Sequence, residues 1–208
     1  MTETATVPRA QLKRERVRNA AQQLFLKSGF GSTSMDAVAT SAGVSKPTLY
    51  RYYENKEALF ADILRDLTRK RIWSDLPTAT LESGVRSRAG LTSVLTAIAQ
   101  SVIHQLLDPT YVGLLRVLIA EIPRFPHLAD LFRAAVLGEG PHVLSSVLQR
   151  ACAAGVVTLP HPEVAARLFI GPLLMYLLTD GLLSAGVPRQ PPPEQIAALA
   201  ELFVKAIA

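Results

Sequence analysis

Apolar residues recur at helical spacing along the first third of the chain, and no stretch alternates apolar and polar positions as a β-strand does. Val17 and Phe25 mark the apolar face of the first predicted helix, and Gly29 follows its end. Gly43 separates two short helices in the same way. The pattern predicts helices over residues 9–27, 34–42, 45–53 and 55–73.

Polar residues at the starts of these helices predict their N-caps. Thr33 is expected to cap the second helix, with Asp36 completing a capping box. Ser45 is expected to cap the third, where Pro47 falls in the first turn and needs no hydrogen-bonded amide. Asn55 is expected to cap the fourth.

Beyond residue 77 the helices become longer and more apolar, and prolines mark their boundaries. The stretch 188–193 reads as a stiff connector, and the apolar run at 168–178 is too short to span a bilayer. Helices are predicted over residues 86–107, 110–122, 126–138, 141–154, 162–185 and 193–207. We therefore expect an all-α protein with a small helix-turn-helix domain at 9–55 and a larger helical domain at 56–208.

The positive charge is concentrated at the N-terminal end. Residues 9–72 hold 13 Lys and Arg against 6 Asp and Glu, whereas residues 73–208 hold 9 against 10. This asymmetry fits either a segment that meets a polyanion or a solvated basic surface with no partner.

The segment 33–53 decides between these interpretations. Two short helices around a tight glycine turn have the layout of a helix-turn-helix, with Val38 and Leu49 among the inward-facing residues. The outer face of the second helix carries Lys46, which suits guanine edges, and Tyr50, whose hydroxyl can donate to phosphate. This segment predicts binding to double-stranded DNA.

The ordered run GFGSTSMDAVATSAGVSKPTLYRYYENKEALFADIL resembles the N-terminal signature of the TetR (tetracycline-repressor) family of bacterial regulators. The resemblance covers about residues 9–72, and residues 111–171 resemble the C-terminal domain of an AefR-like branch. It implies phosphate contacts from Thr33, Tyr50 and Lys56, and base-edge positions for Ser45, Lys46, Pro47, Thr48 and Tyr52. Position 36 is often basic in the family, so Asp36 is expected to cap rather than to contact DNA.

The last two helices suggest a homodimer interface. Residues 162–185 and 193–207 carry apolar stripes that suit either the core or a four-helix contact with a second copy. The stripes consist of Leu168, Met175 and Leu178 and of Ile196, Leu199, Phe203 and Ile207. A dimer also fits the two-fold symmetry of a palindromic operator, with the reading helices about one turn of DNA apart.

The helices at 86–138 could enclose a small, largely apolar effector, whose binding would shift the fourth helix and release the operator. Each polar or aromatic residue within these apolar segments could equally be structural. The candidates are Trp73, His104, Tyr111, Arg116 and Tyr176, with Glu121 beside them.

No catalytic constellation, cofactor motif or metal-ligand spacing is present, so we expect no enzyme, cofactor or metal site. The single cysteine, Cys152, and the absence of a signal peptide fit the cytoplasm, with the protein on the nucleoid when it binds DNA. Two alternatives stay open, namely a DNA-binding regulator that takes no small ligand and a small helical enzyme or carrier.

Overall fold

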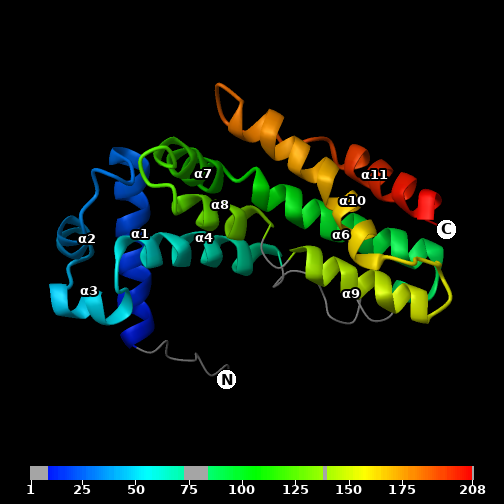
Figure 1. Ribbon diagram of the computed structural model, residues 1–208, viewed down its shortest axis with the longest axis horizontal. Helices are drawn as coiled ribbons and strands as arrows, with labels where there is room; N and C mark the ends of the chain where they lie inside the picture. The colour runs from blue at the N-terminus through cyan, green and yellow to red at the C-terminus, as the bar shows by residue number, and fades with distance from the viewer. Residues whose placement is uncertain (1–8, 73–83, 138–139, 208) are drawn as a thin grey trace, which may run out of the picture. The chain divides into compact units, whose positions relative to one another are not determined.

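Every regular element in the residues that the computed structural model describes (9–72, 84–137 and 140–207) is helical. The prediction of an all-α chain is confirmed (Figure 1). The N-terminal third contains α1 (Arg9–Ser28), α2 (Met35–Ala42), α3 (Lys46–Tyr52) and α4 (Lys56–Ile72). Then come a 3-10 turn η1 (Gly84–Arg86), α6 (Arg88–Leu106), α7 (Pro109–Glu121), α8 (Leu128–Leu137), α9 (Gly140–Ala153), α10 (Pro162–Tyr176), a π-helical segment η2 (Leu177–Leu182) and α11 (Pro193–Ile207).

The chain forms two compact units. The N-terminal unit combines the residues up to Asp66 with Gly113–Phe132, and the C-terminal unit combines Leu67–Val112 with Arg133–Ala208. Helices α4, α7 and α8 therefore each contribute residues to both units. The predicted division of the chain at residue 55 separates a DNA-binding domain from an effector-binding and dimerising domain by their functions, and it stays a prediction.

Aromatic rings form the core of the N-terminal unit. Phe25, Phe30 and Phe60 are fully buried, and their ring centroids lie 4.9–5.6 Å apart. Phe125, from the later segment, meets the ring of Phe30 edge-on at 5.9 Å. Stacked and tilted ring contacts add to the stabilisation that comes from burying the rings. The cluster joins α1, α4 and the segment after α7.

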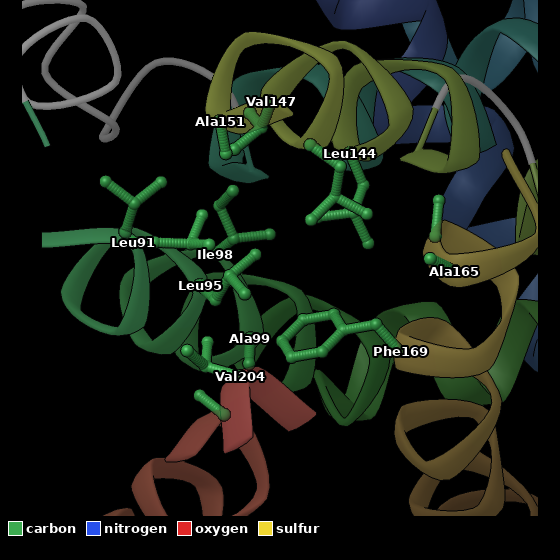
Figure 2. Packing of buried hydrophobic residues seen from close by; sticks show 14 of the residues in the cluster. Leu91, Leu95, Ile98, Ala99, Leu144, Val147, Ala151, Ala165, Phe169 and Val204 are labelled. Atoms are coloured by element: carbon green, nitrogen blue, oxygen red, sulfur yellow. The ribbon is translucent and has the colours of Figure 1, made fainter. Parts of the chain in front are cut away.

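The core of the C-terminal unit lies around α6. Figure 2 shows Leu91, Leu95 and Ile98 of α6 facing Leu144, Val147 and Ala151 of α9. Ala165 and Phe169 of α10 and Val204 of α11 also belong to this cluster.

The predicted helix 162–185 consists of α10 followed by η2. Pro172 lies inside α10, and the Leu183 amide donates to the Leu178 carbonyl, five residues back, as in a π-helix. The combined run Pro162–Leu182 is long and apolar enough to cross a membrane, and about a third of it is buried. The expectation concerned the apolar run at 168–178 alone, whereas this length applies to the whole helical run. A core helix of a non-membrane protein passes the same test.

The two apolar stripes near the C-terminus have different surroundings. Ile196 is buried in the core, and Leu199, Phe203 and Ile207 pack against it. In contrast, Leu168 and Met175 are 66% and 57% exposed, and Leu178 is also exposed. The core interpretation therefore accounts for the α11 stripe, while the α10 stripe stays uncovered in the single chain.

Candidate nucleic-acid interface

The ends of α2 and the start of α3 are set by Ser34, Gly43 and Ser45. Ser34 is extended (φ −101°, ψ 153°) and its hydroxyl accepts from the Ala37 amide, so Ser34 is the N-cap of α2. Gly43 adopts the left-handed conformation (φ 62°) that ends α2. Ser45 caps α3 as predicted, accepting from the Thr48 amide.

The predicted cap and capping box at Thr33 and Asp36 were wrong. The helix begins one residue later than that assignment requires, so Thr33 lies outside the cap position and its hydroxyl donates to the Gly29 carbonyl at 2.8 Å. With Ser34 as N-cap, the capping-box position falls on Ala37, which has no side-chain acceptor.

The inner face of the motif is apolar and closely packed. Val38 and Leu49 are fully buried, and the small Ala39 and Ala42 are nearly so. Arg16 of α1 donates to the Ala42 carbonyl at 2.8 Å, at the C-terminal end of α2 where a cation is favourable. The predicted inward face is therefore correct for these residues.

A polar network fixes the C-terminal end of α3. The Tyr53 hydroxyl donates to Asp62 Oδ2 at 2.6 Å and accepts from Arg14 Nε at 3.1 Å, while Arg14 Nη2 lies 2.9 Å from Asp62 Oδ1. Burial, and then the hydrogen bond to Asp62, raise the pKa of Tyr53 from 10.0 to about 12. The network joins α1, α3 and α4, so it limits rotation of α3.

The outer face of α3 carries the predicted base-reading residues. Ser45, Lys46, Pro47 and Tyr50 are exposed and Thr48 is half-buried. The Ser45 and Thr48 hydroxyls are hydrogen-bonded to each other at 2.8 Å. Four of these five predicted residues are thus open to solvent, and their contact with DNA stays a prediction.

Tyr52 differs from its neighbours on α3. The guanidinium of Arg51 lies 5.4 Å from the centroid of its ring. Its hydroxyl is buried and has no hydrogen-bond partner in the described part of the chain. A contact between this hydroxyl and DNA would require the side chain to turn outward.

The predicted phosphate ligands Thr33 and Lys56 are engaged within the protein. Thr33 is buried, and Lys56 Nζ donates to the carbonyls of Phe30 at 2.6 Å, Thr33 at 2.8 Å and Gly31 at 3.4 Å. The ammonium also lies 4.4 Å from the centroid of the Phe30 ring. Burial lowers the pKa of Lys56. The two residues hold the loop before α2, and their contact with DNA stays a prediction.

The last residue of α7 supports the same loop, and the sequence did not reveal this contact. Glu121 Oε1 accepts from the Gly31 amide at 2.9 Å, so Glu121 has a structural partner rather than a place in a ligand site. His127 Nε2 lies 3.5 Å from Glu57 Oε1 of α4. Only the fold brings these residues close, since about ninety positions separate Glu121 from Gly31 in the chain.

The candidate effector residues are dispersed. His104 is exposed, whereas Tyr111 is fully buried and its hydroxyl donates to the Ala135 carbonyl at 2.8 Å. Tyr176 packs against the core cluster, Arg116 belongs to the N-terminal unit, and Trp73 lies outside the described residues.

Sequence reasoning missed Gln105 on α6, which is fully buried and whose two amide atoms have no hydrogen-bond partner in the described residues. Its position at helical spacing from Ile98 could have revealed it as a polar residue on an apolar face. Cys152 is half-buried against the core. Within the described ranges, no group of three or more His, Cys, Asp or Glu residues could hold a metal ion.

Two family profiles match the chain. The profile of bacterial regulatory proteins of the tetR family matches residues 17–63, and that of the AefR-like transcriptional repressor C-terminal domain matches residues 93–208. The regulator UidR of Escherichia coli is 46% identical over 61 residues, which are 29% of this chain and 31% of UidR. The chain therefore matches only about a third of the length of this curated relative.

Solved structures match over almost the whole chain. The flavonoid-responsive regulator FrrA is 33% identical, covers 94% of this chain and 97% of its own, and has a TM-score of 0.68. A TetR-family regulator from Mesorhizobium loti is 23% identical, covers 96% of both chains and has a TM-score of 0.69. The latter similarity shows the fold alone.

Proposed function

Because the chain belongs to the TetR family of helix-turn-helix DNA-binding transcriptional regulators, which are not enzymes, we propose that it is a homodimeric repressor released by a small apolar effector. It acts in the cytoplasm on a palindromic operator, one half-site for each copy. The observation that carries the proposal is the exposed outer face of α3, with Lys46 and Tyr50.

The outer face of α3 combines exposure with rigidity. Lys46 and Tyr50 are exposed whereas Leu49 is fully buried, and the Tyr53 network holds the end of the helix. A lysine suits guanine acceptors in the major groove, and a tyrosine hydroxyl can donate to phosphate. Because the helix is already fixed, little conformational entropy is lost when it meets DNA.

The exposed stripe of α10 and η2 supports a dimer. Four large apolar residues of this stripe are exposed, namely Val164, Leu168, Met175 and Leu178. With the exposed Gly171 between them, successive members of the stripe are alternately four and three residues apart. This spacing places them on one side of the helical run. A second copy of the chain is the occupant that we assign, because a palindromic operator requires two reading helices related by two-fold symmetry.

The similarity to FrrA supports an effector. FrrA is described as flavonoid-responsive and is 33% identical over nearly its full length. An aromatic, largely apolar molecule would suit a site among the apolar helices of the C-terminal unit. Helix α4 contributes residues to both units and is therefore the element that we expect to carry the change.

DNA binding is tested by fluorescence anisotropy on an operator selected from random double-stranded DNA. We expect Tyr50→Phe to weaken binding to all sequences alike and Lys46→Ala to reduce the preference for the operator. We expect Lys56→Ala to weaken binding uniformly and to make the salt dependence shallower by about one. Tyr176→Phe, a matched change in the C-terminal unit, should leave affinity unchanged. Indifference to all the variants in the motif would contradict the proposed interface.

The dimer is tested by light scattering. Leu168→Glu places a charge in the exposed stripe and should yield monomers with weakened operator affinity. Ile119→Glu, at another exposed apolar residue on α7, is the control and should remain dimeric. A dimeric Leu168→Glu variant would refute this interface.

The effector is tested by adding flavonoids and other apolar aromatic compounds to the operator complex. Release from the operator, together with a raised melting temperature, is expected for a ligand that favours the unbound state. The absence of both effects for every compound would favour a regulator without a small ligand.

A further inference from the structure

A solvent-exposed ion pair links the two helices of the motif. Asp36 stands in the first turn of α2 and Lys46 is the first residue of α3, and Asp36 Oδ2 lies 2.5 Å from Lys46 Nζ. The side chains are 56% and 62% exposed. An ion pair this exposed contributes little to the free energy of folding. Stabilisation of the fold therefore does not explain the pair.

The pair presents donors beside an acceptor. An ammonium has three N–H donors, so two remain on Lys46 after its hydrogen bond to Asp36. The carboxylate keeps unused lone pairs on both oxygens and can accept further hydrogen bonds. The two side chains therefore offer a compact, net neutral group with both hydrogen-bonding functions.

A G·C base pair carries the complementary pattern in the major groove. Guanine presents two acceptors, N7 and O6, and cytosine presents the N4 donor. O6 and N4 are joined by a hydrogen bond and so lie about 2.9 Å apart, close to the 2.5 Å that separates Nζ from Oδ2. In an A·T pair, the N6 donor lies between the two acceptors, N7 and O4. The two adjacent N–H donors of a lysine therefore match an A·T pair less well.

We propose that Asp36 and Lys46 together read one G·C base pair in each half of the operator, with Lys46 on guanine and Asp36 on cytosine. The inference rests on the proposed DNA interface and replaces the expectation that Asp36 only caps α2. A lone carboxylate would be repelled by the phosphates, but its pairing with Lys46 removes the net charge. The same neutrality reduces attraction to DNA that lacks the matching base pair.

The test begins with selection of preferred sites from random double-stranded DNA by the wild-type protein. Dissociation constants are then measured for the best site and for its single base-pair changes, with wild type, Asp36→Ala, Lys46→Ala and the double variant. Asp36→Asn keeps the size of the side chain, and far-UV circular dichroism checks that all variants fold. Glu54→Ala removes a different exposed acid from the motif and is the charge control.

We expect both alanine variants to reduce discrimination at the same G·C pair, by about fivefold or more, and the double variant to lose little beyond either one. Glu54→Ala should strengthen binding to all sequences alike without changing preference. If Asp36→Ala behaves like Glu54→Ala, or if the affected pair is not G·C, the proposal is wrong although the protein still binds DNA. If wild type prefers no sequence, the proposed DNA interface fails first.

Discussion

Gly43, at the turn between α2 and α3, gives a sharp test of how the motif is held together. Its left-handed conformation (φ 62°) is strained for any residue with a Cβ, and an added Cβ would lie 2.6 Å from Arg16 Nη2. That guanidinium would have to move and would lose its hydrogen bond to the Ala42 carbonyl. Gly43→Ala therefore combines backbone strain with a lost contact between α1 and α2.

Gly29 provides the matched control within the same unit. It is also left-handed (φ 81°), but an added Cβ would meet Glu121 Oε1 at an ordinary 3.5 Å. We expect Gly29→Ala to lower the free energy of unfolding by about 1–2 kcal/mol, from backbone strain alone. Gly43→Ala should cost about 1 kcal/mol more, because the bond from Arg16 is charge-assisted but lies near solvent.

The assay is urea unfolding followed by far-UV circular dichroism at one protein concentration, with hydrogen exchange of peptides from α2 and α3 as a local measure. Arg16→Ala removes the side chain that the new Cβ would meet. In that background, Gly43→Ala should cost no more than Gly29→Ala does. Operator affinity should fall for Gly43→Ala more than for Gly29→Ala, since Gly43 sets the angle between the two helices.

Equal costs for the two glycine variants in the parent protein would refute this reasoning. The same holds if removing Arg16 leaves the cost of Gly43→Ala unchanged. Either result would mean that the contact between Arg16 and the end of α2 does not constrain the turn.

Three further variants test other parts of the structure. The pKa of Tyr53 is raised from 10.0 to about 12, so the stabilising effect of the protonated Tyr53 hydroxyl should be complete below pH 10 and lost as the pH rises through about 12. Tyr53→Phe can no longer donate to Asp62, so urea titrations of this variant should lack that alkaline loss of stability. Gln105→Met replaces an unpaired buried amide and should raise the free energy of unfolding by about 1–2 kcal/mol, whereas destabilisation in the same titration would show that the amide is satisfied. Glu121→Ala leaves the Gly31 amide without its acceptor and should speed hydrogen exchange there, while Glu121→Gln keeps an acceptor oxygen and should not.

Local patterns in the sequence sufficed for most of the fold. Apolar spacing and glycines located the helices, and Gly29 and Gly43 are left-handed at the expected helix ends. The cap of α2 was misplaced by one residue because Thr33 and Ser34 are both good cap residues, and only the backbone of Ser34 decides between them. The C-terminal end of α10 was also hard to predict, because the π-helical segment η2 continues the same apolar pattern.

The site was less predictable because its residues pair across the fold. Exposure of Lys46 and Tyr50 followed from the pattern of the third helix. The pairing of Lys46 with Asp36, and the burial of the Lys56 ammonium among backbone carbonyls, depend on how the helices pack. The sequence gives the type of each side chain and the helix face on which it lies. It does not give the residue that each side chain contacts across a turn or a loop.

The contribution of Gly113–Phe132 to the N-terminal unit has a consequence for exchanging parts between regulators. A chimaera that takes only the first four helices would leave behind Phe125, which covers the ring of Phe30, and Glu121, which binds the Gly31 amide. The graft would then expose an aromatic ring beside the loop that precedes α2. A DNA-binding unit that can be transferred from this protein therefore consists of two stretches of chain, and the second must be transferred together with the first.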